Sequence, residues 1–329
     1  MKRTIAIVAG GDSSEWQVSL RSAAGLKQFI DSEKYTKYIV TIVGKQWQAE
    51  LPDGRKFPID KNDFSFTLDG TKITFDFAYI TIHGTPGENG ILQGYFRLLR
   101  IPFSCCDVLA AALTFDKFAC NQYLKSFGVN VAQSVWLHRG DKIDEAAIAA
   151  KIGLPCFVKP CDGGSSFGVT KVKTADRLHE AIDKAFAEGS EVMAEALMTG
   201  TEVTCGMYRT RTKEVIFPIT EVVTDNEFFD YDAKYNGQVQ EITPARIPDE
   251  WARNVQNETR KIYSALNAKG IIRIDYMIDT DGIPHLIEVN TTPGMTATSF
   301  IPQQVRAAGL DIKDVLTDII ENEFVVAGK

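Results

Sequence analysis

Late in the chain, apolar and polar side chains alternate on both sides of the turn signal Asp281–Gly282. Asp-Gly is a favoured centre for a two-residue hairpin turn, which pairs residues placed symmetrically about it. Asp275 is then expected opposite Glu288, and Arg273 opposite Asn290, all on one face because strand side chains alternate. A four-residue turn on the same centre keeps this register, whereas a three-residue turn would break it. The neighbours expected on the other face, against a core, are Ile272, Ile274, Ile287 and Val289.

This hairpin predicts a metal site. Asp275, Glu288 and Asn290 would offer two carboxylates and an amide oxygen on facing strands, and like charges directly opposite each other are unfavourable without a cation between them. Mg²⁺ suits such a set, because it takes one or two carboxylates and completes its shell with water and phosphate oxygens. Arg273 would lie close enough to contact a phosphate on the metal. A surface salt-bridge cluster is the alternative, and the metal interpretation is favoured over it.

The first third of the chain predicts a small doubly wound α/β domain. An apolar strand at residues 5–9 is followed by a glycine turn, a helix over 18–30 and a strand over 38–43, which together form a βαβ unit. Tight turns at Asp53–Gly54 and Asp69–Gly70 predict short hairpins. A third strand over 75–82, a helix over 92–99 and a strand beginning at 101–104 complete this part.

The remainder predicts an α+β arrangement, because its strands come in runs that favour antiparallel sheets with helices on one side. A polar, aromatic-rich segment over 224–240 is expected to be a long functional loop. Helices are expected over 115–127, at a short acidic segment before 156, up to residue 187 and over 250–267; strands are expected over 131–137, 156–159, 169–172, 192–197, 202–209 and 215–222, with the hairpin last.

A glycine-rich turn over 159–168 begins with Lys159 at the end of a strand. Glycines allow backbone N–H groups to close on phosphate oxygens, and the lysine adds positive charge. The spacing is not that of a P-loop, and no helix follows directly. Glycine-rich turns are usually structural, so the phosphate interpretation depends on the metal site predicted later in the chain.

Two candidates at the ends of early strands are ambiguous from the residues alone. The turn over 10–15 lacks the dinucleotide-binding spacing of glycines, and Ser13 or Ser14 could cap the following helix with Glu15 in its first turn. His83 ends a strand beside Gly84, at the sheet edge where ligands gather in α/β proteins. A lone histidine is more often structural.

Composition excludes several classes of protein. Acidic residues outnumber basic ones by 43 to 36, and a net charge of −7 argues against a protein that coats nucleic acid or an anionic membrane. No apolar stretch approaches the roughly 20 residues of a membrane helix, and the apolar run near the N-terminus is too short for a signal peptide. The six cysteines lack metal or redox spacing and are expected to be buried thiols. We therefore expect a cytoplasmic protein.

Several ordered motifs resemble one family, the D-alanine–D-alanine ligases of the ATP-grasp superfamily. The stretches 83–94 and 273–295 match its two signatures, and between them lie 115–117, 158–160, 164–168 and 231–235 in the family's order. The resemblance implies an N-terminal α/β Rossmann-like domain (1–107), followed by two α+β ATP-grasp subdomains with antiparallel sheets (108–194 and 195–329). The segment 224–240 would be a closing loop of the last subdomain.

The resemblance also implies the reaction. ATP would phosphorylate the carboxylate of one D-alanine, and the amine of a second would attack the acyl phosphate to give D-alanyl-D-alanine for peptidoglycan precursors. Phosphoryl transfer of this kind needs charge neutralisation and alignment. The implied cofactor is Mg²⁺, two ions with Mn²⁺ as a possible substitute, and the implied substrates are D-alanine and ATP. Relatives are commonly homodimers.

On the side of the nucleotide, the resemblance implies three groups of residues. The two Mg²⁺ ions would be held by Asp275, Glu288 and Asn290. The phosphates would be contacted by Lys117, Lys159 and Lys234. The adenine hinge would be formed by Glu195, Ala196 and Met198, with Glu202 at the ribose.

On the side of the amino acids, the resemblance gives Glu15 the ammonium of the first D-alanine, with His83 nearby, which replaces the capping interpretation of Glu15. The link that fastens the closing loop would be Glu15, Ser165 and Tyr235. The tetrahedral species would be stabilised by Arg273 and the N–H of Gly294. The second D-alanine would be bound by Ser299 and Phe300.

Three positions depart from the common pattern: Ala196 stands where many relatives have lysine, Thr292 replaces serine, and Trp16 replaces histidine or arginine. Tyr235 stands where relatives that use D-lactate have histidine, and this favours an amine acceptor. Two alternatives remain, a ligase with D-lactate or D-serine as acceptor and a regulatory nucleotide-binding protein without catalysis. The second should lack part of the set Arg273, Asp275, Glu288 and Asn290, which is complete.

Overall fold

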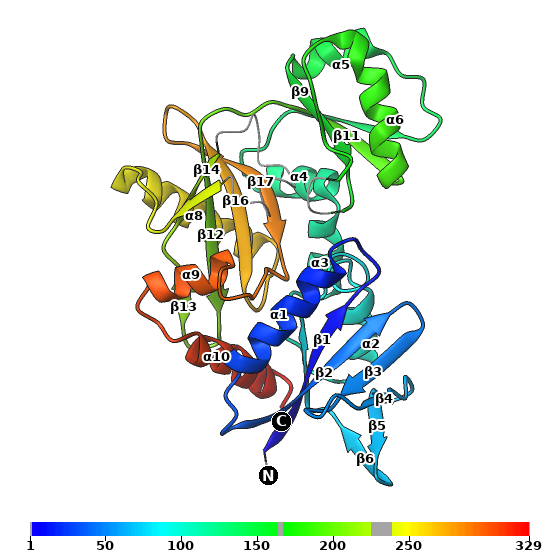
Figure 1. The fold of residues 1–329 in the computed structure, drawn as a ribbon. Helices are drawn as coiled ribbons and strands as arrows, with labels where there is room; N and C mark the ends of the chain where they lie inside the picture. Colours follow the sequence, from blue (N-terminus) through cyan, green and yellow to red (C-terminus); the bar gives the residue numbers. More distant parts are fainter. Residues whose placement is uncertain (1, 164–166, 225–238, 329) are drawn as a thin grey trace.

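The fold is described from a computed structural model, which covers residues 2–163, 167–224 and 239–328. In these ranges the strands form three larger sheets and one small hairpin, in separate parts of the chain (Figure 1). Among the described helices, none combines the length and apolar content needed to cross a bilayer.

The first sheet confirms the doubly wound pattern expected of the first third. Its strands in spatial order are β4 (Lys56–Pro58), β3 (Gln46–Glu50), β2 (Tyr35–Val43), β1 (Arg3–Gly10) and β7 (Phe77–Ile80), with β2, β1 and β7 parallel. Alternate residues of β1 face opposite ways: Ile5 and Ile7 pack with α1 (Trp16–Phe29), and Ala6 and Val8 pack with α2 (Ile91–Leu98). Helices therefore cover both faces, as the βαβ pattern predicts.

Both predicted turns form hairpins, but the strand expected from residue 101 is reduced to one bridge. Asp69 and Gly70 take positive φ angles between β5 (Ser65–Leu68) and β6 (Thr71–Thr74). Phe103 bridges Ala78 of β7. The pairing ends there because the hydroxyl of Ser104 accepts the N–H of Ile80 at 3.0 Å, in place of a backbone carbonyl.

The second sheet is antiparallel and has a core of its own. Its spatial order is β10 (Thr170–Val172), β9 (Cys156–Pro160), β11 (Glu191–Ala196) and β8 (Ser134–His138). The helices α5 (Glu145–Ile152) and α6 (Leu178–Glu188), the latter after a 3₁₀ turn (Ala175–Arg177), pack on one face. The opposite face carries Lys159, Met193 and Glu195.

The third sheet holds the predicted hairpin. Its path is β15 (Val239–Ile242), β14 (Thr220–Thr224), β12 (Thr201–Arg209), β16 (Ile272–Ile278) and β17 (Pro284–Asn290), with β13 (Glu214–Ile216) also paired to β12. One face packs on α8 (Asp249–Ala265) and on α4 (Lys117–Lys125), which is preceded by α3 (Val108–Phe115). The helix α3 was not predicted. The strand expected over 215–222 is two strands, β13 and β14, interrupted around Pro218.

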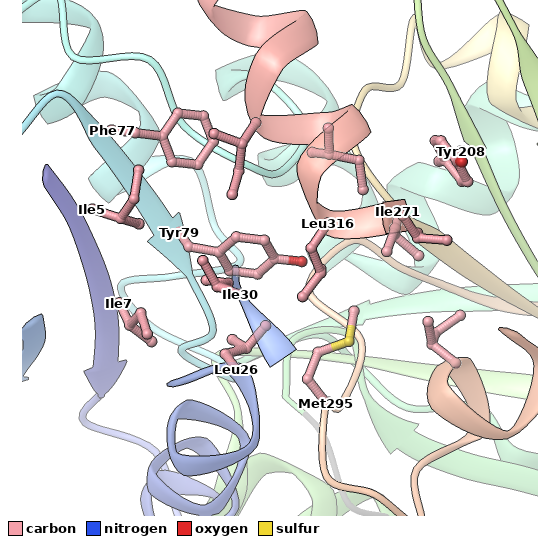
Figure 2. Close-up of a cluster of buried hydrophobic side chains, with 14 of the residues drawn as sticks. Ile5, Ile7, Leu26, Ile30, Phe77, Tyr79, Tyr208, Ile271, Met295 and Leu316 are labelled. Carbon is pink, nitrogen blue, oxygen red and sulfur yellow. The ribbon is translucent and has the colours of Figure 1, made fainter. Parts of the chain in front are cut away.

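Two C-terminal helices that the sequence analysis did not predict, α9 (Phe300–Ala307) and α10 (Ile312–Val326), connect the first and third sheets. Leu316 of α10 lies in one buried cluster with Ile5 and Tyr79 of the first sheet and Tyr208 of the third (Figure 2). The first and last parts of the chain therefore share a hydrophobic core.

Candidate functional site

The hairpin of β16 and β17 has the predicted pairs, but it reaches them by a different route. Asp275 lies opposite Glu288 and Arg273 opposite Asn290, as predicted. The turn, however, has three residues, because the N–H of Asp279 bonds the carbonyl of Ile283 at 3.1 Å. A bulge at Ile287 then shifts the register back by one residue.

The bulge also corrects the expectation for Ile287, which was predicted to face the core. Ile287 is half-buried and has no pairing partner. Ile272, Ile274 and Val289 do lie in the core cluster of this sheet, as expected. The polar face of the hairpin is therefore intact, and the extra residue, Ile287, forms the bulge in β17, the last strand of the sheet.

Asp275 is the centre of the polar cluster on this face. Arg273 donates to both of its oxygens, from Nε at 2.9 Å and from Nη2 at 2.8 Å. The hydroxyl of Thr204 donates to Oδ1 at 2.6 Å, and the amide of Asn290 donates to Oδ2 at 3.1 Å. A bidentate pair of this kind is among the stronger charged hydrogen-bond arrangements.

Arg273 is held in its charged form. Burial opposes that charge, but the attraction of Asp275 outweighs it and raises the pKa of the guanidinium above its ordinary value. Glu288 adds to this attraction. The cluster thus combines one fixed cation with two carboxylates on neighbouring strands.

The donor set fits a magnesium ion. Asp275 and Glu288 face each other across the ladder, and the amide of Asn290 completes a group of hard oxygen donors. Within the described residues, no group of three His, Cys, Asp or Glu side chains is placed to hold a metal. Two carboxylates with water and phosphate oxygens are what Mg²⁺ prefers over an all-protein cage.

Glu15 and His83 come together at the carboxyl edge of the first sheet. Glu15 is the half-buried residue that precedes α1. The hydroxyl of Ser13 accepts its N–H at 3.2 Å and donates to the carbonyl of His83 at 2.7 Å. No side chain at the N-cap position bonds the helix, so the capping interpretation is not supported. His83 is buried, and its Nε2 has no hydrogen-bond partner among the described residues.

Glu88 joins this edge to the third sheet, and the sequence analysis missed it. Its carboxylate accepts the N–H of Gly84 at 2.7 Å and the hydroxyl of Thr292 at 2.7 Å. Burial raises its pKa, while the charge of His83 and these two hydrogen bonds oppose the increase. Its place inside the first family signature was a signal that could have identified it.

The segment after β17 lies between these two groups. The backbone N–H of Met295 donates to the hydroxyl oxygen of Ser22 on α1 at 3.2 Å. A Cβ on Gly294 would lie 3.0 Å from the hydroxyl of Ser299, so these two residues are close together. The guanidinium of Arg273 lies over the ring of Phe300, 5.2 Å from its centre. The structure thus brings Gly294, Ser299, Phe300 and Arg273 to one place.

The predicted nucleotide residues gather on the second sheet. Lys159 and Glu195 form a partly buried ion pair of 2.7 Å, and Asn121 of α4 donates to the other oxygen of Glu195 at 3.4 Å. Lys117 donates to the carbonyl of Gly163 at 2.6 Å. The lysine at the start of α4 therefore reaches the glycine-rich turn, as a shared phosphate site requires.

The hinge positions lie where the chain passes from the second sheet to the third. Ala196 ends β11 and bonds the carbonyl of Gln133 through its N–H at 2.9 Å. Met198 is half-buried in the connection. Glu202 follows in β12, two residues before Thr204 and so on the same strand face. Thr204 was also missed, although its alternation with Glu202 indicated this face.

Three predicted residues, Ser165, Lys234 and Tyr235, lie outside the described residues, as does most of the segment 224–240. The six cysteines are buried free thiols, as expected.

Comparison with known proteins identifies the family. A family model described as D-ala D-ala ligase N-terminus matches residues 4–106, and one described as D-ala D-ala ligase C-terminus matches residues 123–321. The chain is 66% identical to the D-alanine–D-alanine ligase of Bacteroides fragilis (strain YCH46) over 324 residues, which are 98% of this chain and 100% of that protein.

Two solved structures extend the likeness to the fold. The VanG D-Ala:D-Ser ligase of Enterococcus faecalis is 30% identical with a TM-score of 0.85, covering 98% of this chain and 100% of that one. The D-alanine–D-alanine ligase of Bacillus anthracis complexed with ATP is 29% identical with a TM-score of 0.78, covering 99% of each chain. The chain therefore belongs to the D-alanine–D-alanine ligase family.

Proposed function

We propose that this chain joins two D-alanine molecules into D-alanyl-D-alanine in an ATP-dependent reaction that proceeds through an acyl phosphate. Membership of the family supports the reaction, and the residues of the polar hairpin face support the way it is carried out. The observation that carries the proposal is the intact cluster of Arg273, Asp275, Glu288 and Asn290, which a non-catalytic nucleotide-binding relative would not need.

The first D-alanine would lie at the edge of the first sheet. Glu15 would accept hydrogen bonds from its ammonium group, and the unpartnered Nε2 of His83 would be available to its carboxylate. This placement leaves that carboxylate directed toward the third sheet, where a phosphoryl donor would be needed.

The triphosphate would lie between the second and third sheets. Asp275, Glu288 and Asn290 would hold two Mg²⁺ ions, or Mn²⁺ in their place. These residues would place positive charge from the bound metal beside the phosphates, where it would neutralise the negative charge that develops there. Lys117, Lys159 and Lys234 would contact the phosphates. For the base, Glu195, Ala196 and Met198 would form the hinge, and Glu202 would bind the ribose.

The second D-alanine would lie against α9. Ser299 would bind its carboxylate and Phe300 would line its pocket, so that its amine meets the acyl phosphate. Arg273 and the N–H of Gly294 would stabilise the tetrahedral oxyanion. Ser165 and Tyr235, with Glu15, would fasten the segment 224–240 over the site, and the exclusion of water protects the acyl phosphate from hydrolysis.

The three sheets support a division into units of residues 1–107, 108–194 and 195–329, in the ATP-grasp layout. The last boundary falls within β11, and α3 and α4 lie at the junction because their apolar sides pack on the third sheet. We place the reaction in the cytoplasm, where ATP and the amino acid are available.

A homodimer is proposed on the basis of α2 and α3. Leu98 is 85% exposed and Leu109 is 75% exposed, on two helices that pack against each other. An ion pair of 2.6 Å between Arg97 and Asp107 joins the same two helices. A surface with apolar side chains and both signs of charge can complement a second copy of itself, as a two-fold interface requires.

The test is a phosphate-release assay with ATP and Mg²⁺ on D-alanine, D-serine and D-lactate, each with its L-form, combined with product identification. D-Alanine alone should give ADP, phosphate and the dipeptide. Turnover only with D-alanine plus D-lactate or D-serine would reassign the acceptor, and no turnover with any pair would reject the proposal.

A further inference from the structure

The third sheet has a gap beside β12, at the residues that lie opposite the polar cluster. β14 pairs with β12 only at Val203 and Thr204, and β13 pairs only from Met207 onward. Between them, the carbonyl of Thr204 and the N–H of Gly206 face the gap in the sheet. Buried backbone groups of this kind need partners.

The side chain of Gln304 on α9 fills the gap. Its Oε1 accepts the N–H of Gly206 at 3.0 Å, and its Nε2 donates to the carbonyl of Thr204 at 3.0 Å. Nε2 also donates to the hydroxyl of Thr220 on β14 at 3.1 Å, so both amide hydrogens are used. Gln304 is 0% exposed. A buried amide with every group satisfied fixes its neighbours in one arrangement.

The two backbone groups held by Gln304 belong to the residues paired with the cluster. Thr204 is paired with Asp275 across the β12–β16 ladder, and Gly206 is paired with Arg273. The contact is close, because a Cβ on Gly206 would lie 2.6 Å from Oε1 of Gln304. The side-chain amide of Gln304 therefore connects α9 to β12, the strand that pairs with Arg273 and Asp275.

Gln304 also lies one helical turn after the acceptor-side residues. Ser299 precedes α9 and Phe300 is its first residue. Phe300 lies under the guanidinium of Arg273, so a small displacement of the helix would separate the ring from the cation. The position of the helix start relative to Arg273 is thus set by a contact four residues further along.

We propose that Gln304 is a positioning residue that holds α9 at the correct distance from Arg273 and so determines how the second amino acid is bound and oriented. This inference rests on the proposed role of Ser299 and Phe300. We expect Gln304 to affect the second step more than the first, because β12 is also held by its ladder with β16.

The test compares Gln304→Met, which keeps the length of the side chain and removes all three hydrogen bonds, with Thr259→Val. Thr259 is equally buried and bonds Tyr276 from α8, on the face of the sheet away from α9. Both variants lose buried hydrogen bonds, so both are expected to lower the stability of the chain. Only Gln304→Met should change the use of the acceptor.

Two reactions separate the steps. With hydroxylamine as the nucleophile, the acyl phosphate gives D-alanyl hydroxamate and phosphate, and no second amino acid is needed. Gln304→Met should form hydroxamate within about 2-fold of the parent, while its dipeptide formation at sub-saturating D-alanine falls by about 10-fold. Thr259→Val should change neither reaction by more than about 2-fold. Equal loss of both reactions in Gln304→Met, or no loss of either, would overturn the inference.

Two further variants keep the result interpretable. Ser299→Ala should also lose dipeptide formation and keep hydroxamate formation. If Ser299→Ala has no effect, the proposed acceptor site is wrong. If Ser299→Ala has an effect and Gln304→Met has none, only the role of Gln304 is rejected.

Thr220→Val is the substitute if Gln304→Met does not fold. It removes one of the three hydrogen bonds of Gln304 and should cause a smaller loss of dipeptide formation. An unchanged dipeptide rate in this variant would count against the inference.

Discussion

The bidentate pair with Arg273 makes Asp275 a costly position to mutate. Asp275 is tied to Arg273, Thr204 and Asn290, so its replacement would leave a buried arginine without its partner. Glu288 lies opposite it across the ladder. Because Asp275 carries the bidentate pair with Arg273, we test metal binding at Glu288.

Glu288→Gln should reduce ATP turnover by about 100-fold, because an amide binds Mg²⁺ more weakly than a carboxylate and removes one negative charge. The melting temperature without ligands should stay close to that of the parent. Turnover as a function of Mg²⁺ concentration is the measurement. A variant with the parent's turnover and magnesium dependence would remove Glu288 from the metal site.

Glu88→Gln should make the chain less sensitive to alkaline pH. Burial raises the pKa of Glu88 above its ordinary 4.5, so its contribution to stability is present below that value and is lost as the pH rises through the raised pKa. A glutamine does not ionise and so avoids this loss of stability. The loss amounts to about 1.4 kcal/mol for each unit by which the pKa of Glu88 is raised. The glutamine can still accept from Gly84 and donate to Thr292, whose hydroxyl can turn toward the carbonyl of Ile82.

Urea unfolding of the parent and of Glu88→Gln at about pH 5 and about pH 8 measures this effect. The free energy of unfolding of Glu88→Gln, relative to that of the parent, should be higher at about pH 8 than at about pH 5. A difference that is constant with pH, or that moves the other way, would show that Glu88 is ionised without penalty in the folded chain.

At the residue scale, the sequence predicts those site residues that lie on a single pair of neighbouring strands. The alternation around Asp281–Gly282 was enough to place Asp275 opposite Glu288. It was not enough for Glu88 or Gln304, because their partners come from other elements that are distant in the sequence. A glutamine on an amphipathic helix gives no sign that its amide completes a sheet.

At the element scale, the packing of α9 on β12 depends on the absence of a side chain at Gly206. A Cβ there would lie 2.5 Å from a methyl carbon of Ile301 and 2.9 Å from the ring of Phe217. Neither distance is tolerated in a packed core, so the helix or the strand would have to move.

Gly206→Ala should therefore lower the free energy of unfolding by about 1–3 kcal/mol and weaken dipeptide formation more than hydroxamate formation. The matched control is Gly94→Ala on α2, where a Cβ meets nothing within 4 Å. That variant should be stabilised by about 0.5–1 kcal/mol, the difference in helix propensity. Chemical unfolding of both variants checks the pair; a neutral Gly206→Ala would contradict the close contact.

The elements that the sequence analysis missed have physical explanations. The segment 215–222 begins with the apolar run 215–217, and its interruption at Pro218 was overlooked although proline cannot donate a ladder hydrogen bond. The hairpin register was correct only because the bulge at Ile287 offsets the three-residue turn, and a bulge of this kind leaves no local sequence signal. The helices α9 and α10 do carry signals, since Asp311 caps α10 and apolar residues recur along it at helical spacing.

At the scale of the whole molecule, the proposed dimer predicts a change of mass. The parent should have the mass of two chains in light scattering, and Leu98→Asp with Leu109→Asp should weaken association by at least about 10-fold, because two buried charges replace apolar contacts. The matched control is Val326→Asp, an exposed position on α10. A parent of single-chain mass, or a double variant that remains dimeric, would contradict the proposed surface.

The whole-molecule arrangement was predictable in part. Strand spacing and the family resemblance predicted an N-terminal α/β part followed by parts with antiparallel sheets. The hydrophobic core shared by the first and third sheets could not be predicted. A sequence pattern shows that one face of an element is apolar, but it does not show which other element covers that face. Leu316 and Tyr79 are far apart in sequence and lie in one cluster.

One consequence concerns motion. The second sheet and its helices share a hydrophobic core of their own, between residues 135 and 196, and Figure 1 shows this part projecting from the rest. The first and third sheets are joined by a common cluster. Rotation of the second sheet as a rigid body would leave both of these hydrophobic cores intact. The proposed nucleotide site would then open while the proposed sites of the two amino acids keep their arrangement.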